Sequence, residues 1–299
     1  MGIFSKKTKI GVHSGSFHPD DVFAVATLKL LLGNDIRIVR TRDPNELTLC
    51  DYVVDVGSVY NVAQRRFDHH QKGGAGEREN GIPFAAFGLV WKEYGKQICG
   101  GDDRVSNKID KELVQFIDAM DNGVGTVLPV KADVYPFDVC SIIALMDPCG
   151  DEESLVNEYF GRAVHMAQTI LENCIYSFKL LFVGEKYIAD AYAKSGDKRF
   201  IILDRNVEWR ELVSHYKDLL FVIEGIPGTN QWKVRAVRDS VHNFTNRKDL
   251  PLSWAGKQNA ELAEASGVPD ALFCHNKRFI VTAASKAGAL ALVKKALEA

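Results

Sequence analysis

The chain has 299 residues, of which 46% are apolar and 25% charged, a composition typical of a globular protein long enough for two domains. The formal net charge of −2 gives no overall basic field, so a polyanionic partner must be attracted by a local basic patch or by bound metal. No apolar run approaches the length of a membrane span, and residues 1–7 lack the apolar stretch of a signal peptide. We therefore expect a cytoplasmic protein without a membrane partner.

The first third of the chain alternates short β-rich runs with a helical pattern. Strands are predicted at 9–13, 36–41 and 52–56, and a helix at 20–32 that ends at Gly33-Asn34. Because strands that alternate with helices usually pair in parallel, this rhythm predicts a parallel sheet. Further helices are predicted at 82–98, 109–120 and 152–181.

The C-terminal half predicts a second α/β unit. A strand is predicted at 200–203, and the runs 219–224 and 231–237 flank residues 225–230, whose Gly-Ile-Pro-Gly-Thr-Asn sequence is strong turn chemistry for a β-hairpin. An apolar run at 279–282 and a helix from Lys286 close the unit. The predicted fold class is α/β, with an N-terminal parallel-sheet domain at 1–150, a helical connector at 151–185 and a smaller C-terminal domain at 186–299.

Histidines and carboxylates cluster in the first quarter of the chain. Four of the eight histidines lie there, each beside a carboxylate: His13, His18, His69 and His70. The segment 13–21 ends a predicted strand and begins a helix, so its side chains are expected to project from the carboxyl edge of the sheet. Open α/β sheets bind their ligands at that edge.

Further carboxylates follow at the ends of predicted elements. Asp55 comes at the tip of the apolar strand that contains Val53 and Val54, where a buried charge needs a partner. Asp118 and Asp121 come at the end of a helix, and we expect one of them to be a ligand and the other to be structural. Mixed imidazole and carboxylate ligands suit Mn, Mg, Fe or Zn, and none of these stretches contains a cysteine.

So many candidate ligands favour a pair of divalent ions. Two ions about 3.5 to 4 Å apart stabilise both the entering and the leaving oxygen in a displacement at phosphorus. They need a shared carboxylate, and Asp55 is our candidate because it lies between the two histidine clusters in the sequence. The simpler alternative is that Asp20 or Asp21 only caps the following helix. The constellation as a whole favours metal, since several acidic residues at strand ends otherwise repel one another.

Several motifs together resemble, in order, those of the DHH phosphoesterase superfamily, and above all its melanocyte-proliferating-gene (Myg) family. They are His13 to Asp20, Asp55-Val56-Gly57, Asp68-His69-His70-Gln71 and 118–123. The match extends to 39–44 and to 267–275. The resemblance implies a DHH-type catalytic domain, a C-terminal substrate-binding domain and an active-site cleft between them. It also implies two Mn²⁺ or Mg²⁺ ions and 3′ to 5′ exonuclease activity on RNA. Of the two metals, we expect Mn²⁺.

Carried onto this sequence, the resemblance gives each residue of the cluster a role. It implies that His13 and His18 bind a first ion, that Asp20, His69 and Asp121 bind a second, and that Asp55 bridges the two. His70 then resembles the group that contacts the substrate phosphate, so Asp55 and His70 are the expected catalytic pair. Where His18 stands the wider superfamily usually has Asp, so the metal preference is not inherited. The Gly-Gly-Gly-His signature of many superfamily C-terminal domains is also absent.

The C-terminal half contributes its own substrate candidates. Arg235, Arg238, His242 and Arg247 lie on and just beyond the second hairpin strand, with Trp232 and Trp254 nearby, and His275 follows later. Arginines beside aromatic rings suit phosphate contact and base stacking. The alternative is that the charges on this strand form only its solvated face.

The leading hypothesis is a two-metal phosphodiesterase, a 3′ to 5′ exonuclease that acts on RNA or short oligonucleotides through a metal-activated water. One alternative is a phosphoesterase acting on a cyclic or phosphorylated nucleotide. Another is a metal-containing protein that binds nucleic acid without catalysis. The oligomeric state is left open, with a homodimer as one option.

Overall fold

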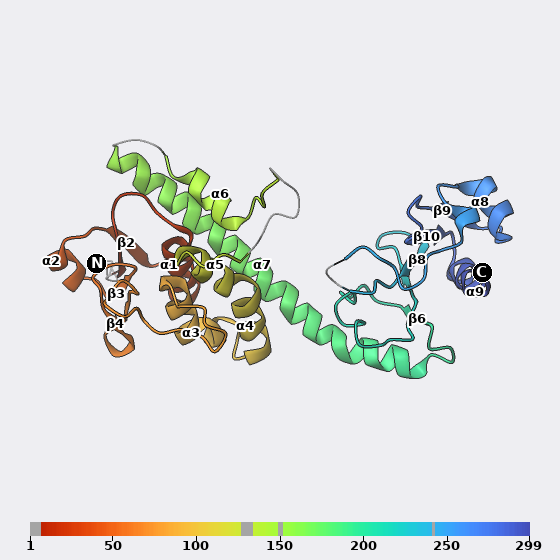
Figure 1. Cartoon of the computed structure of the whole chain (residues 1–299), viewed down its shortest axis with the longest axis horizontal. Helices are drawn as coiled ribbons and strands as arrows, with labels where there is room; N and C mark the ends of the chain where they lie inside the picture. The colour runs from red at the N-terminus through yellow and green to blue at the C-terminus, as the bar shows by residue number, and fades with distance from the viewer. Residues whose placement is uncertain (1–6, 127–133, 149–151, 241–242) are drawn as a thin grey trace, which may run out of the picture. The chain divides into compact units, whose positions relative to one another are not determined.

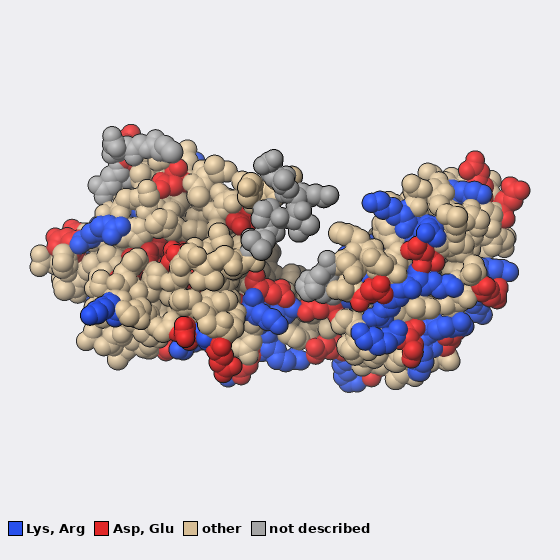
Figure 2. Space-filling model, viewed as in Figure 1, with Lys and Arg blue, Asp and Glu red and all other residues tan. Residues whose placement is uncertain are grey.

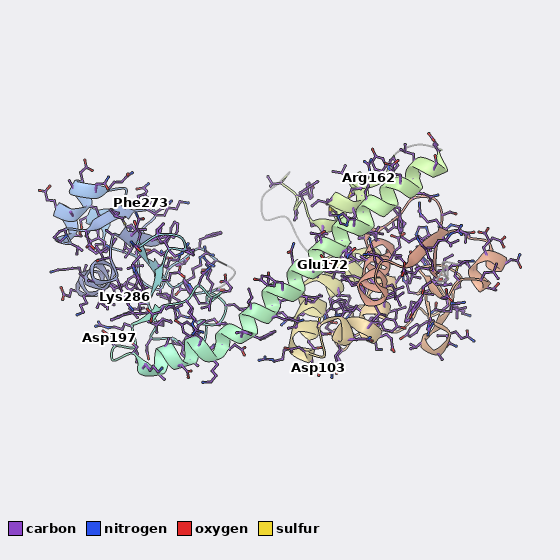
Figure 3. All side chains as sticks on the ribbon, turned by 180° about the vertical axis from the view of Figure 1, so that it is seen from behind. Asp103, Arg162, Glu172, Asp197, Phe273 and Lys286 are labelled. Atoms are coloured by element: carbon purple, nitrogen blue, oxygen red, sulfur yellow. The ribbon has the colours of Figure 1, made fainter. Side chains whose placement is uncertain are left out.

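The computed structural model describes residues 7–126, 134–148, 152–240 and 243–299. These residues form two compact units, 1–178 and 179–299, and the division between them falls within one long helix, α7 (Glu153–Lys194). The expected connector at 151–185 therefore corresponds to most of this helix. In Figure 3, Arg162 and Glu172 lie on the part of α7 that belongs to the first unit, whereas Asp197 follows its C-terminal end.

The first unit is built on the predicted parallel sheet. Its five strands are β1 (Thr8–Val12), β2 (Ile36–Arg40), β3 (Tyr52–Val54), β4 (Tyr60–Asn61) and β5 (Arg66–Phe67). They lie in the order β2-β1-β3-β5-β4, and every neighbouring pair is parallel except β4 with β5. The carboxyl ends of β1, β3 and β5 therefore meet at one edge of the sheet.

The two faces of this sheet are covered by different helices (Figure 1). On one face, α1 (Pro19–Leu32) packs against α3 (Ala86–Ile98) and contacts β1 and β3. On the other face, Leu47 of α2 (Pro44–Thr48) packs with Cys50 and Val53. Gly11 in β1 faces Leu47 so closely that an added Cβ atom would lie 3.0 Å from it, which explains the small residue between Ile10 and Val12.

Two predicted helices differ from the observed ones in their limits. The helix expected at 82–98 begins only at Ala86, because Pro83 disfavours helical backbone before it and residues 77 and 83 pair as an isolated β-bridge. The helix expected at 109–120 is longer: α4 (Asp103–Ile109), a π-helical turn η2 (Asp110–Val114) and α5 (Gln115–Asp121) follow without a break. The sequence pattern gave no sign of the π-helical turn.

The remaining helices of the first unit are α6 (Val139–Met146) and the first part of α7. Asp138 caps α6 by accepting a hydrogen bond from the backbone N of Ser141. Phe160 of α7 packs edge-to-face on Phe17, with ring centroids 5.5 Å apart, and so supports the loop before α1. None of the helices in the described ranges is long and apolar enough to cross a membrane.

The second unit is the predicted second α/β unit, and the hairpin around 225–230 is confirmed. Its strands are β6 (Phe200–Leu203), β7 (Phe221–Gly225), β8 (Trp232–Ala236), β9 (Ala271–Cys274) and β10 (Ile280–Ala283). The sheet order is β6-β7-β8-β10-β9, with only β6 and β7 parallel. The helices are α8 (Asn259–Ser266) and α9 (Lys286–Glu298). Leu292 and Val293 of α9 pack into the core beneath Phe221 and Val234.

Candidate metal centre

The candidate ligands gather where β1, β3 and β5 end. His13 follows β1, Asp55 follows β3, and His69 lies two residues beyond β5. The backbone N of Asp55 donates to the carbonyl of Phe67 at 3.1 Å, which continues the pairing of β3 with β5 up to the edge. Three parallel strands thus bring together residues that are up to 56 positions apart in the sequence.

Asp21, not Asp20, caps helix α1. Its Oδ1 atom accepts from the backbone N of His18 at 3.0 Å, and its Oδ2 atom lies 2.9 Å from Nε2 of His13. Asp21 therefore fixes both histidines of the first loop while stabilising the start of the helix. Asp20 is fully buried and accepts from the backbone N of Ala86 at 3.3 Å. Of the two neighbouring carboxylates that could cap the helix, Asp20 is the one left for the cluster.

Asp55 faces a histidine on each side. Its Oδ2 atom lies 3.3 Å from Nε2 of His13, and its Oδ1 atom lies 3.3 Å from Nε2 of His69. Burial opposes ionisation of this carboxyl, but the closeness of His13 and His69 outweighs it and lowers its pKa to about 2. Its φ of 53° is left-handed, a conformation that Asp and Asn tolerate better than most residues. This backbone turn ends β3 and aims the carboxylate between the two histidines.

A second set of ligands surrounds His69. Its Nε2 atom lies 3.3 Å from Oδ2 of Asp121 and 3.8 Å from Oδ2 of Asp20. Burial raises the pKa of Asp20 well above its ordinary value, and the nearby carboxylates of Asp55, Asp121 and Asp21 raise it further. Several carboxylates held this close favour a cation among them.

The residues fit a divalent metal. Buried Oδ1 atoms of Asp20 and Asp55, and Nε2 of His69, have no hydrogen-bond partner among the residues that the structure describes. Buried polar atoms without partners are costly, and a cation would satisfy all three. Three groupings place their ligand atoms within 4.8 Å of one another: His13 with His18 and Asp55; Asp55 with His69 and His70; and His18 with Asp20 and Asp121. Nitrogen and oxygen donors of this kind are typical of divalent-metal sites.

His70 is one of the exposed members of the cluster. Its side chain is 59% exposed, against 9% for His69, and its Nδ1 atom lies 2.8 Å from Oδ1 of the buried Asp68. Asp68 also accepts from the backbone N atoms of Ser58 and His70. The carboxylate therefore holds the His70 ring in place and leaves the rest of the ring open to the cavity.

Asp118 lies outside the cluster. It is fully buried, its Oδ2 atom lies 2.7 Å from Nη1 of Arg78, and its Oδ1 atom accepts from the backbone N of Gly88 at 3.0 Å. Arg78 also pairs with Asp110 of the π-helical turn at 2.9 Å. Asp118 thus joins α5 to α3 through Gly88, whereas Asp121 is the carboxylate that reaches His69. Among the described residues, Asp121 lies beside His69 and Asp118 pairs with Arg78, so the geometry favours Asp121 as the ligand and Asp118 as the structural residue.

An open cavity extends from the cluster. It is lined by His18, Asp55, His69, His70, Asp121 and residues of α6. The α6 wall, with Cys140 and Ser141, was not anticipated from the sequence, because nothing in its pattern links it to the strand ends. Burial raises the pKa of the Cys140 thiol to about 12, and Asp138 and Asp20 add to the shift.

The substrate candidates of the second unit separate into two groups. Arg235 and Arg238 line one cavity together with Trp209, Arg210 and Phe279, none of which the sequence pattern singled out. Arg247 instead donates to the backbone carbonyls of Ser214, Tyr216 and Leu219, so its guanidinium group holds a loop.

The other candidates do not line that cavity. His275 lies in the turn between β9 and β10, with its ring 4.4 Å from that of Phe279, which does line it. Trp254 is buried in the core, and Trp232 packs against the core with Lys286 over its ring. His242 lies outside the described residues.

Comparison with known proteins covers nearly the whole chain. Residues 9–297 match the MYG1_exonuc family, which is described as an uncharacterised protein family (UPF0160). A MYG1 protein of Dictyostelium discoideum is 31% identical over 96% of this chain and 96% of its own length. A MYG1 protein of Chlamydia pneumoniae is 31% identical over 91% of this chain and 90% of its own, and the MYG1 exonuclease of Rattus norvegicus is 28% identical over 97% and 84%. The chain belongs to the MYG1_exonuc family.

Proposed function

We propose that this protein is a two-metal phosphodiesterase that removes nucleotides from the 3′ end of RNA. The observation that carries the proposal is the position of Asp55, whose two carboxylate oxygens face His13 on one side and His69 on the other. A carboxylate in that position can be shared by two ions, as two-metal hydrolysis of a phosphodiester requires.

The candidate ligands can be divided between two sites around Asp55. We assign His13 and His18 to one ion, and Asp20, His69 and Asp121 to the other. His18 also lies close enough to Asp20 and Asp121 to be within reach of the second ion. Bound divalent ions stabilise charge on the reacting phosphate and lower the pKa of the attacking water. Manganese is the metal that we propose, and the mixed imidazole and carboxylate ligands are compatible with it.

His70 would act on the substrate instead of holding a metal. It is the most exposed of the cluster histidines that face Asp55, and Asp68 fixes its ring through Nδ1. The remaining ring nitrogen, Nε2, can donate to a nonbridging phosphate oxygen of the bond that is cut. Such a donor stabilises the charge that develops on the phosphate during the displacement.

The nuclease assignment is supported by the comparisons. Relatives from rat, mouse and human are named MYG1 exonucleases, and this chain aligns with them over 97% of its length. The polarity of cleavage and the preference for RNA follow from the resemblance to the Myg family, whose members are described as acting 3′ to 5′ on RNA.

The test is a ladder assay on single-stranded RNA and DNA of the same sequence, labelled at the 5′ end and incubated with Mn²⁺, with Mg²⁺ or with EDTA. We expect progressive shortening of the 5′-labelled RNA with Mn²⁺ and none with EDTA. Immediate release of the 5′-terminal nucleotide would contradict the polarity. Faster hydrolysis of a cyclic or mononucleotide substrate than of any oligomer would favour a small-molecule phosphoesterase.

A further inference from the structure

The two units carry opposite net charge. Residues 179–299 contain 19 Lys and Arg against 14 Asp and Glu, whereas residues 1–178 contain 18 against 25. On the face shown in Figure 2, blue lysine and arginine side chains are prominent on the second unit. The near-neutral total therefore hides a basic unit that attracts anions and an acidic unit that attracts cations.

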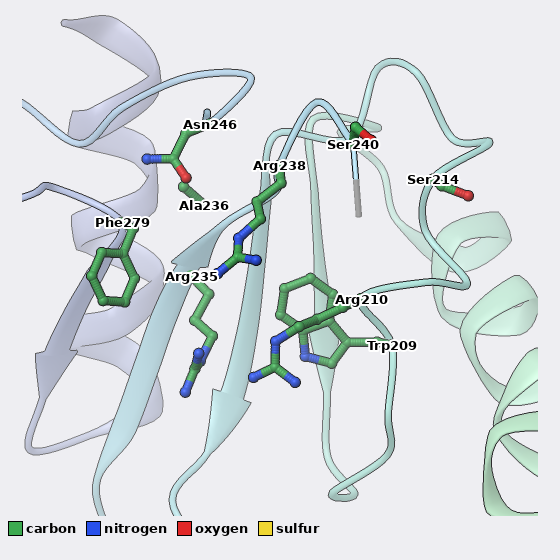
Figure 4. A pocket seen from close by; sticks show the side chains of 9 residues that line it. All are labelled: Trp209, Arg210, Ser214, Arg235, Ala236, Arg238, Ser240, Asn246 and Phe279. Carbon is green, nitrogen blue, oxygen red and sulfur yellow. The ribbon is translucent and has the colours of Figure 1, made fainter. Parts of the chain in front are cut away.

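One cavity of the basic unit brings three arginines together. It measures about 610 Å³ including its open mouth, and it is lined by Trp209, Arg210, Ser214, Arg235, Ala236, Arg238, Ser240, Asn246 and Phe279. Figure 4 shows the guanidinium groups of Arg210, Arg235 and Arg238 directed into one space, with Phe279 on one side and Trp209 on the other. We call this cavity the arginine pocket.

The cations in and beside the arginine pocket outnumber the carboxylates that face them. The buried Glu224 is shared by Lys233 and Arg235, each 3.2 Å away, and it also accepts from Nε1 of Trp209 at 3.1 Å. Burial lowers the pKa of Arg235, and the nearby Arg210 lowers it further, which reflects the closeness of the two cations. One buried carboxylate cannot neutralise both of its basic partners, so positive charge remains for a ligand.

The other two arginines have donors left for a ligand. Arg210 pairs with Glu208 through Nη1 alone, at 2.9 Å. Within the described part of the chain, Arg238 has no carboxylate partner, and its guanidinium group lies 4.4 Å from the ring centroid of Phe244. Because a guanidinium fork matches two oxygens of a phosphate at once, this pair of arginines suits a phosphate.

Aromatic groups complete the pocket. Phe279 lines it, and Phe244, which is 86% exposed, stacks on Arg238 at its edge. Rings and arginines at this spacing are typical of sites that bind the backbone of a single strand and stack its bases. Asn246 also lines the pocket. Its Nδ2 atom donates to Asp249 at 2.8 Å, so the side-chain oxygen is the atom of this amide that could contact a ligand.

We propose that the arginine pocket binds a phosphate and the adjoining base of single-stranded RNA, at a nucleotide other than the one being removed. The proposal rests on the nuclease function above and extends it, because it assigns substrate binding to Arg210, Arg238 and Phe244. It gives the basic unit the task of holding the strand while the metal cluster of the acidic unit cuts it.

Binding of RNA to the full chain tests the proposal without hydrolysis. Fluorescence anisotropy of a 5′-labelled 12-residue single-stranded RNA is measured in EDTA for the wild type, R238M and R210M. The matched control is R205M, which removes an exposed arginine of the same unit that lies over Tyr187, outside the pocket. We expect about tenfold weaker binding and a smaller salt dependence for R238M and R210M, with R205M equal to the wild type. Equal losses in all three variants, or in none, would overturn the proposal.

Steady-state kinetics separate a failure of the pocket from a failure of the nuclease function. Bis(p-nitrophenyl) phosphate carries one phosphodiester, so it cannot fill the metal cluster and the arginine pocket together. With Mn²⁺, we expect R238M to lower kcat/KM for RNA at least tenfold more than for this small substrate. If the wild type hydrolyses neither substrate yet binds RNA through the pocket, the nuclease function fails alone. If R238M lowers both activities equally, the pocket proposal fails alone. Thermal melting confirms that each variant is folded.

Discussion

Nε2 of His13 lies 3.3 Å from Oδ2 of Asp55, so the residues that follow two neighbouring strands meet over the edge of the sheet. Asparagine at position 55 tolerates the left-handed φ of 53° but offers only one oxygen and no charge. D55N should therefore keep its fold, and its rate of hydrolysis should fall on the order of 10³-fold. This loss is larger than the roughly 10- to 100-fold loss that is typical when a residue that only supports a metal ligand is changed. Circular dichroism and RNA hydrolysis with Mn²⁺ measure the two properties; retained activity would contradict the shared role of Asp55.

The two carboxylates of α5 should behave in opposite ways when each is changed to asparagine. D121N removes a group 3.3 Å from His69, so it should lower metal content and activity with little loss of stability. D118N leaves the largely buried Arg78 without one of its two partners, so it should lower the free energy of unfolding by about 3 kcal/mol while metal content persists. Urea denaturation and metal analysis of both proteins decide; the reverse pattern would make Asp118 the ligand.

His70 is expected to matter for turnover and not for metal. H70A removes a 59%-exposed ring that Asp68 holds at the mouth of the cavity. We expect metal content to stay at the wild-type level while kcat falls by roughly 10² to 10³. D68N weakens the hydrogen bond that holds the His70 ring, so its kcat should lie between those of H70A and the wild type. Loss of metal from H70A would place His70 among the ligands instead.

Metal affinity should depend steeply on pH. Burial lowers the pKa of His13, but Asp21 and Asp55 outweigh it and raise the pKa to about 10, so the imidazole is protonated at neutral pH before metal binds. A ligating nitrogen must lose that proton, and the apparent affinity for Mn²⁺ should therefore rise with pH between 6 and 8, by up to about tenfold per unit for each proton displaced. Calorimetry in two buffers of different protonation enthalpy counts the protons released; an affinity independent of pH would exclude His13 as a ligand.

The cluster could be anticipated from the sequence because it follows from the order of elements. His13 and Asp55 each come at the end of a predicted strand, and parallel neighbours bring such positions to one edge. The two-residue strand β5 before His69 was not predicted, and His69 was placed in the cluster by its neighbours Asp68 and His70. The turn of the β7–β8 hairpin could also be predicted, since it is rich in Gly, Pro, Thr and Asn and lies between apolar runs.

The roles of individual carboxylates could not be read in this way. Asp20 and Asp21 lie on different sides of the first turn of α1, and this difference decides which of them caps the helix. Asp118 and Asp121 both lie on α5, and they differ in which neighbouring residue each one meets. The partner of Asp118, Arg78, lies 40 residues earlier in a loop, where no pattern points to it. The arginine pocket was predicted only in part. Arg235 and Arg238 were recognised as substrate candidates on and just beyond one strand, but Arg210 reaches the same space from a separate loop.

Counting the manganese bound per chain tests the central claim, a pair of ions that share Asp55. The wild type and D55N are purified without metal, titrated with Mn²⁺ and examined by native mass spectrometry, with RNA hydrolysis measured at each point. The account predicts two Mn²⁺ per wild-type chain, with activity appearing as the second ion binds, and at most one ion and no activity in D55N. A wild-type chain that hydrolyses RNA without bound metal, or a D55N chain that binds two ions and cuts RNA, would contradict it.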